Sequence, residues 1–355
     1  MRSPGPTFTP RLLRWYDKNR RELPWRRPAA SDAPLDPYHV LLSETMLQQT
    51  QVVTVIPYFH RFLERFPTLN ALADAPRQDV LRLWQGLGYY SRARNLQAAA
   101  QMIVRELNGQ IPTSVDELLK LPGVGRYTAG AIASIAFDRR APILDGNVQR
   151  VLCRLDCVKD DPRNREINQR LWQRAGEILP SKRIGDFNSA LMELGATICT
   201  PRNPQCLRCP VHKHCEALAA EMQEIIPLAK KAVPTPLVHR QTFCIRHGNR
   251  WLIEQRPASG RWAAMWQFVT LACEPPTSEN AVRLPVETSP PQPLLRISHT
   301  LTHRRYRFEV FTCDAVNDYS PVDVNPRRWM TLRNLHKFPL PKPHVKIADA
   351  LRQRR

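Results

Sequence analysis

Two hydrophobic patterns divide the chain. From residue 8 to about residue 220, apolar side chains recur every three or four positions, which is the period of amphipathic helices. From about residue 237, short stretches alternate apolar and polar positions, as half-buried strands do. The expected helices are 8–19, 38–49, 52–66, 80–84, 93–107, 115–120, 127–137, 148–157, 167–179 and 186–198, and the expected strands are 241–246, 251–255, 267–271, 296–299 and 307–312.

These patterns predict two domains joined by a linker, which fits a length of 355 residues. We expect a mainly α domain over residues 8–220 and a smaller α+β domain over residues 237–355. Charge and proline content rise over residues 221–236, as is typical of an interdomain linker. Residues 274–293 are rich in Pro, Ser and Thr and predict a loop, and residues 344–352 predict a final helix.

The charge of the chain indicates what it binds. Its 52 Lys and Arg residues against 32 Asp and Glu give a net charge of +20. Such an excess predicts a polyanionic partner, above all nucleic acid. Residues 1–6 lack the apolar run of a signal peptide, and the longest nearly apolar stretch, 127–137, is too short to cross a bilayer. We therefore expect a soluble, cytoplasmic, nucleoid-associated protein with no membrane partner.

Four cysteines occur within 17 residues at spacing C-x6-C-x2-C-x5-C: Cys199, Cys206, Cys209 and Cys215. Thiolates at such spacing predict one metal site, because zinc and iron–sulfur clusters both accept sulfur ligands. Zinc sites usually pair two short C-x2-C hooks, so a single hook with longer arms favours a [4Fe–4S] cluster. Zinc and two disulfides stay as alternatives. The other five cysteines are scattered, which indicates a reducing compartment.

A glycine-containing turn joins two predicted helices at Leu121-Pro-Gly-Val-Gly125. Ser114 and Glu117 predict a capping box at the start of the first helix. Gly123 and Gly125 permit a tight turn and close approach of another backbone. The second helix then offers free N–H groups and its positive dipole end to a phosphate. An ordinary helix joint is the alternative, but in a chain of charge +20 the block favours DNA phosphate contact.

The turn, the aspartate at Asp145 and the cysteine loop resemble the helix-hairpin-helix DNA glycosylases that carry a [4Fe–4S] cluster. Within them, segments 43–51, 84–92 and 144–150 resemble the MutY-type adenine DNA glycosylases. The resemblance is dense over residues 8–220 and weaker beyond. It implies a mainly α fold: a helix-hairpin-helix glycosylase domain with a cluster loop, followed by a smaller α+β Nudix-like domain.

The resemblance implies a monomeric, monofunctional base excision repair enzyme. Its substrate would be double-stranded DNA with adenine opposite 8-oxoguanine or guanine. The enzyme would flip the adenine out of the stack and hydrolyse its glycosidic bond, a reaction that needs an acid and a second carboxylate.

Two carboxylates are candidates for this chemistry. Glu44 lies among apolar residues on a predicted helix, where desolvation would raise the pKa of its carboxyl. A solvent-facing Glu is the alternative, and the resemblance assigns Glu44 the protonation of adenine N7. Asp145 stands where a helix N-cap would keep it ionised, and by resemblance it stabilises, or bonds to, the sugar C1′. Asn147 would orient Asp145 or the nucleophile.

Tyr127 indicates whether the enzyme only removes a base or also cleaves the DNA strand. The related endonuclease III type carries a lysine at this position, whose amine attacks the sugar and leads to strand cleavage. Tyr127 has no amine, so base removal without an efficient lyase step is expected. Tyr127 would instead pack in the pocket or form a hydrogen bond near the site.

Further contacts are implied by the resemblance alone. Gln49, Thr50, Leu87 and Tyr89 match positions around the base opposite the target. Tyr89 would wedge into the stack, and Gln49 would fill the vacated space; core packing is the alternative for Leu87 and Tyr89. Trp25 and Arg26 resemble the rim of the adenine pocket, and the extra residues 29–35 follow them.

Residues 251–268 resemble the opening of a Nudix fold. The glutamate-rich box that binds magnesium is missing, because Cys273-Glu-Pro-Pro follows, so recognition is expected in place of hydrolysis. The Phe-Ser-His recognition loop of the family reads Ile297-Ser298-His299 here. By resemblance Ser298 and His299 sense 8-oxoguanine, with a Ser-His pair at a strand end as the alternative.

Other classes of function remain as alternatives. One is an endonuclease III-like pyrimidine-lesion glycosylase with lyase activity, which Tyr127 argues against. Another is a non-catalytic iron–sulfur DNA-binding protein, which the presence of both Glu44 and Asp145 argues against.

Overall fold

The computed structural model describes residues 6–28, 35–228, 234–273, 284–301, 304–317 and 326–354. The chain forms two compact units: residues 1–74 with 95–231, and residues 75–94 with 232–355. The sequence placed residues 75–94 in the helical domain, whereas here they group with the C-terminal residues. Most of the extra segment 29–35, the centre of the expected linker and much of the expected loop 274–293 lie outside the described residues.

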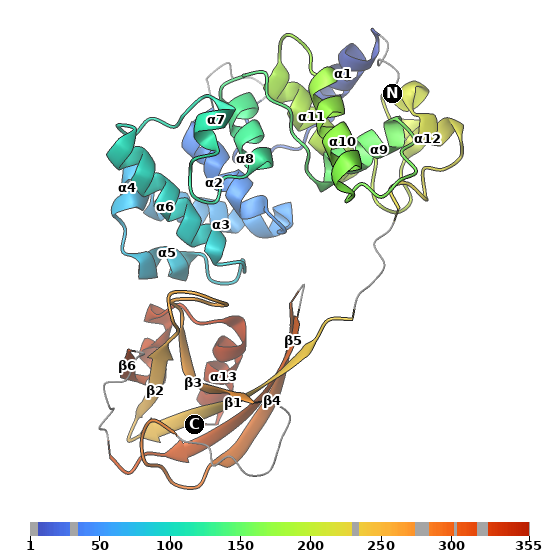
Figure 1. Cartoon of the computed structure of the whole chain (residues 1–355). Helices are drawn as coiled ribbons and strands as arrows, with labels where there is room; N and C mark the ends of the chain where they lie inside the picture. The colour runs from blue at the N-terminus through green and yellow to red at the C-terminus, as the bar shows by residue number, and fades with distance from the viewer. Residues whose placement is uncertain are drawn as a thin grey trace. The chain divides into compact units, whose positions relative to one another are not determined.

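The first unit is helical. In Figure 1, α9, α11 and α12 gather near α1, and α2 lies beside α8. The predicted helix 127–137 is interrupted, because α8 passes into a single π-helical stretch, η1. The helices of the helical region are α1 (Phe8–Asn19), α2 (Pro37–Leu47), α3 (Val52–Arg65), α4 (Leu69–Asp74), α5 (Arg77–Leu83), α6 (Ser91–Glu106), α7 (Val115–Leu118), α8 (Arg126–Ala131), η1 (Ile132–Ala136), α9 (Gly146–Leu155), α10 (Arg165–Glu177), α11 (Ile184–Thr197), η2 (Cys206–Arg208), η3 (His212–His214) and α12 (Glu216–Ala219).

Helix α2 is a buried helix that carries one acidic residue. Asp36 caps it by accepting the N–H of Tyr38 at 2.8 Å, and Pro37 stands at its first position, where a missing N–H costs nothing. All residues from 40 to 46 are buried, so Glu44 is held inside the fold. The helix ends at Leu47, and Gln49 just beyond adopts a left-handed conformation with φ 57°.

Helices α9 and α11 pack closely where α9 begins. A Cβ atom on Gly195 of α11 would lie 2.7 Å from the Cβ of Asn147, closer than real Cβ contacts come. Only glycine therefore lets α11 approach the first turn of α9. Phe187, Leu191 and Leu194 of α11 complete the buried core that also includes Phe8 and Leu12 of α1.

The hairpin between α7 and α8 has the predicted chemistry. Ser114 Oγ accepts the N–H of Glu117 at 3.3 Å and donates to its carboxylate at 2.7 Å. Gly123 is left-handed, with φ 78°, and a Cβ there would lie 2.5 Å from the Cβ of Asn95. Gly125 is extended and is the N-cap of α8. The turn thus needs glycine at position 123 for two separate reasons.

We expect Gly123→Ala to destabilise the fold by about 1–3 kcal/mol, the cost of a strained backbone position. The substitution forces a side chain into left-handed space and against Asn95. Gly125→Ala is the matched control, because nothing lies within 4 Å of a Cβ there. Thermal unfolding of both variants measures the difference. Equal shifts in melting temperature would contradict a specific requirement at Gly123.

The second unit contains one mixed six-stranded sheet in the order β4-β5-β1-β3-β2-β6. Only β1 and β5 pair in parallel among its described pairings, and the others are antiparallel. Helix α13 packs on one face, where Ile347 and Leu351 meet Phe268 and Phe308 (Figure 1). The elements are β1 (Leu237–His247), β2 (Arg250–Gln255), β3 (Trp266–Cys273), β4 (Gln292–Leu301), β5 (Arg304–Asp314), β6 (Arg327–Thr331), η4 (Leu332–Lys337) and α13 (Lys342–Gln353).

Residues 75–94 bond to this domain through side-chain amides. Gln78 Nε2 donates to the carbonyl of Ala264 at 3.2 Å, and Gln85 Oε1 accepts the N–H of Leu340 at 3.2 Å. Within the described residues, no helix is both long and apolar enough to cross a membrane.

Candidate active site

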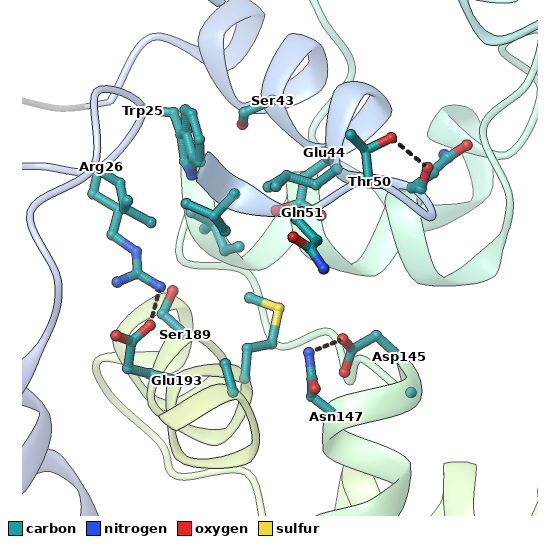
Figure 2. A pocket seen from close by; sticks show the side chains of 18 of the residues that line it. Trp25, Arg26, Ser43, Glu44, Thr50, Gln51, Asp145, Asn147, Ser189 and Glu193 are labelled. Atoms are coloured by element: carbon teal, nitrogen blue, oxygen red, sulfur yellow. Dashed lines mark hydrogen bonds and ion pairs between the residues drawn. The ribbon is translucent and has the colours of Figure 1, made fainter. Parts of the chain in front are cut away.

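One cavity of about 1030 Å³ in the first unit collects eight of the predicted site residues. Figure 2 shows Glu44 on one side, with Asp145 and Asn147 across the cavity and Glu193 and Ser189 on a third wall. The sequence-predicted residues that line it are Trp25, Arg26, Glu44, Gln49, Thr50, Tyr127, Asp145 and Asn147. They come from five separate stretches of the chain, so the fold brings them together.

Glu44 is a buried acid that accepts one hydrogen bond. The Tyr127 hydroxyl donates to Glu44 Oε2 at 2.7 Å, and the Glu44 side chain is almost wholly shielded from water. Burial raises the pKa of Glu44 to about 7. The hydrogen bond from Tyr127 lowers this pKa, and the nearby charge of Asp145 raises it further. A substantial fraction of Glu44 therefore carries a proton near neutral pH.

Asp145 lies in a different environment. It is the N-cap of α9, with Oδ1 accepting the N–H of Val148 at 2.7 Å and Oδ2 accepting Asn147 Nδ2 at 3.0 Å. Burial raises the pKa of Asp145, and these donors work against the rise because they favour the carboxylate. The cavity thus holds the Glu44 carboxyl in an apolar helix and the Asp145 carboxyl among hydrogen-bond donors. This arrangement favours the protonated acid at Glu44 and the anion at Asp145.

A hydrogen-bonded path links Asp145 to the cysteine loop. Arg150 NH2 donates to Asn147 Oδ1 at 2.9 Å and to the carbonyl of Gly195 at 2.7 Å. Arg150 Nε donates to the carbonyl of Cys199 at 2.7 Å. Since Asn147 in turn donates to Asp145, the position of the carboxylate depends on the backbone of the first cysteine.

Sequence reasoning missed a second buried carboxylate in the cavity. Glu193 of α11 is fully buried and accepts Arg21 Nε at 2.6 Å and Arg26 NH2 at 2.8 Å. Burial pushes the pKa of Glu193 upward, but the hydrogen bond from Arg21 and the charge of Arg26 outweigh it and leave the pKa lowered. An acid among apolar residues near the end of the helix Ile184–Thr197 is the same signal that marked Glu44, and it could have identified Glu193.

The residues predicted to surround the opposite base divide between the units. Gln49 is exposed and left-handed at the edge of the cavity, next to Thr50. Tyr89, in the second unit, is also left-handed and is 40% exposed, with the Arg92 guanidinium 5.6 Å from its ring centre. Leu87 is buried, which favours the alternative of core packing for that residue.

The predicted strand 296–299, which contains Ser298 and His299, is confirmed. Both lie inside strand β4, where Ser298 is paired with Arg307 and His299 with Tyr306. Because successive strand residues point to opposite faces, the two side chains diverge. Ile297 is buried in the domain core, and the Trp262 ring lies 6.1 Å from His299, measured between ring centres.

An arginine of α9 holds the start of the cysteine loop. Buried Arg154 donates to Cys199 Sγ at 3.3 Å and to the carbonyl of Thr200 at 2.7 Å, which fixes the start of the loop.

Comparison with known families defines the class of the chain. Residues 42–177 match the HhH-GPD superfamily of base excision DNA repair proteins, and residues 241–350 match the NUDIX domain. Residues 199–215, the span of the four cysteines, match the iron–sulfur binding domain of endonuclease III. These matches confirm the predicted fold class and the [4Fe–4S] cluster. The chain is a helix-hairpin-helix DNA repair enzyme with a Nudix-like second domain.

Curated relatives define the family within this class. The adenine DNA glycosylase of Homo sapiens is 37% identical over 93% of this chain and 71% of its own length. That of Buchnera aphidicola subsp. Schizaphis graminum is 34% identical and is covered over 98% of its length, with 96% of this chain aligned. The chain belongs to the adenine DNA glycosylase family.

A solved structure supports the helical fold. The structure of a thermostable thymine-DNA glycosylase is similar to 60% of this chain and 96% of its own, with a TM-score of 0.54 and 29% identity.

Proposed function

We propose that this enzyme removes adenine mispaired with 8-oxoguanine, and with guanine, and that it does so as a monofunctional monomer. The observation that carries the proposal is the cavity in which a buried Glu44, with a pKa of about 7, faces a capped Asp145. Cleavage of a purine from deoxyribose needs an acid for the leaving base and an anion for the sugar cation. The two carboxyls supply one of each.

In the proposed reaction, protonated Glu44 donates its proton to N7 of the flipped adenine. The positive charge that develops on the sugar lies near ionised Asp145, which Asn147 and the α9 backbone hold in place. A water molecule then adds to the sugar C1′ and gives its proton to the Glu44 carboxylate, which restores the acid. Tyr127 orients the Glu44 carboxyl through its hydroxyl. Glu193, Arg21 and Arg26 form a polar wall that positions the base.

The experiment that tests the function is single-turnover adenine release from three matched duplexes, with adenine opposite 8-oxoguanine, guanine or thymine. We expect fast release opposite 8-oxoguanine, measurable release opposite guanine and little opposite thymine. No adenine release from any duplex, with the cluster intact, would reject the proposal and favour a pyrimidine lesion or plain DNA binding.

Recognition of the opposite base is assigned to exposed side chains in both units. Gln49 and Tyr89 are left-handed residues with exposed side chains, which suits insertion into an opened base stack. In the second domain, burial together with the charges of Lys342, Lys346 and Arg261 lowers the pKa of His299, so its ring is neutral near pH 7 and offers one donor and one acceptor.

We expect no covalent enzyme–DNA adduct when the reaction is treated with borohydride. A trapped adduct requires an amine that attacks the sugar, and Tyr127 occupies the position where the lyase type has its lysine. The measurement is denaturing electrophoresis of enzyme, labelled duplex and borohydride. Efficient trapping would place the enzyme with the bifunctional glycosylases.

We expect Arg150→Lys to slow adenine release about 10–100-fold, the usual effect of losing a partner that orients a reacting group. Lysine keeps the charge but cannot donate to Asn147, Gly195 and Cys199 together. Arg202→Lys, at an exposed position of the cysteine loop, is the matched control. Single-turnover rates are compared at equal cluster absorbance near about 400 nm. Equal rates for both variants would exclude the path through Arg150.

A further inference from the structure

A second cavity of about 350 Å³ lies against the first, also within the first unit. Arg26, Ile135 and Ser189 line both cavities, so a wall of three side chains separates them. Figure 2 shows that the Arg26 guanidinium reaches Glu193 beside Ser189. The second cavity therefore begins directly behind the wall that Arg26 and Glu193 form.

Arg26 is the part of this wall that can move. Its guanidinium donates to Glu193 at 2.8 Å and to the carbonyl of Arg21 at 3.2 Å, and it lies 5.7 Å from the centre of the Tyr16 ring. Glu193 keeps its second partner, Arg21, when Arg26 turns away. When Arg26 turns away, only Ile135 and the small Ser189 remain of the lining that the two cavities share.

The second cavity suits a planar aromatic ligand. Tyr16, Ala136 and Phe137 line it together with the guanidinium groups of Arg20 and Arg27, and the charged side chains of Asp138, Arg183 and Asp186 complete the lining. Guanidinium planes stack on aromatic faces, and apolar walls accept a flat ring. Its volume lies at the lower end of the range for small-molecule sites, about 300–1,000 Å³, and is adequate for a single purine.

The proposed reaction creates the need for such a site. A flipped nucleotide enters from the DNA side, and its sugar then fills the mouth of the first cavity. After bond cleavage the detached base cannot leave by that mouth while the abasic strand stays bound. We infer that the second cavity receives the detached adenine and releases it to solvent past Arg20 and Arg27, an inference that rests on the proposed function.

The test compares the rate of glycosidic bond cleavage with the rate at which the detached adenine leaves the complex. Duplex DNA with tritium-labelled adenine opposite 8-oxoguanine is mixed with excess enzyme. Acid quenching measures all adenine formed, and rapid gel filtration without quenching measures the adenine that has left the complex. Ala136→Trp fills the second cavity from a residue that does not line the first, and Ala136→Ser is its matched control. Arg27→Trp, at an exposed rim position, obstructs the exit without a change in the core.

For the unchanged enzyme and Ala136→Ser, free adenine should appear at the rate of chemistry, before the abasic strand dissociates. For Ala136→Trp and Arg27→Trp, the rate of adenine formation measured after acid quenching should change less than twofold. The rate at which adenine leaves the complex, measured by gel filtration, should fall at least tenfold. The inference would be overturned if adenine left each of the four proteins only when the abasic strand dissociates. Equal rates of adenine escape from all four proteins would also overturn it. Absence of adenine from the quenched samples would instead reject the proposed function.

Discussion

Glu44→Gln is expected to lower the single-turnover rate of adenine release by about a thousandfold, within the range for loss of a general acid. Glutamine has nearly the same shape and accepts the Tyr127 hydroxyl, so the helix and the cavity keep their form. It has no transferable proton, and the purine must then leave without protonation. DNA binding, measured by titration of a labelled duplex, should be preserved. A rate within tenfold of the unchanged enzyme would remove Glu44 from the acid role.

The carboxyl of Glu44 also predicts how the rate of adenine release depends on pH. Its pKa is raised to about 7, so the acid form predominates below pH 7 and falls about tenfold per unit above it. The rate of the chemical step should therefore decline as the pH rises through about 7. Tyr127→Phe removes a hydrogen bond that favours the anion, so its decline should begin at a higher pH. A decline that begins at lower pH would contradict the assigned direction of the Tyr127 effect.

Asp145→Asn is expected to slow adenine release by about a hundredfold to a thousandfold, the range for loss of a group that stabilises transition-state charge. Asparagine is as good an N-cap as aspartate, so α9 should keep its first turn and the protein its melting temperature. The substitution removes the negative charge that faces the sugar cation. Single-turnover rates and thermal unfolding are measured on the same preparation.

Asp145→Ala provides the comparison that separates the two roles of this residue. Alanine removes both the charge and the helix cap. The rate of adenine release should therefore fall as in Asp145→Asn, and the free energy of unfolding should also fall by about 1 kcal/mol. If Asp145→Asn loses stability like Asp145→Ala, or keeps a rate near that of the unchanged enzyme, the separation of cap and charge is wrong.

Local chemistry in the sequence predicted much of the site. The apolar pattern of residues 38–49 predicted the helix that encloses Glu44, and the capping position of Asp145 was visible before its hydrogen bonds. Glu193 was missed because its partner Arg21 is 172 residues away, and a contact at that distance leaves no local pattern. An acid inside an apolar helix nevertheless implies a buried cation somewhere, so the signal was present.

The second domain was less predictable. Strands β1 and β5 begin before the predicted ranges, because their first residues, 237–240 and 304–306, do not alternate apolar and polar side chains. Those ends are held by backbone pairing between β1 and β5, a parallel contact that side-chain periodicity does not encode. Pairing with β5 likewise extends the predicted strand 296–299 to the full length of β4, Gln292–Leu301. The grouping of residues 75–94 with this domain also depends on contacts distant in sequence.

The path from Cys199 through Arg150 and Asn147 to Asp145 has a consequence for biosynthesis. A newly made chain whose cysteine loop has not yet closed lacks the carbonyl that holds Arg150, and its reacting carboxylate is not yet positioned. Maturation of the loop and acquisition of activity are then one event.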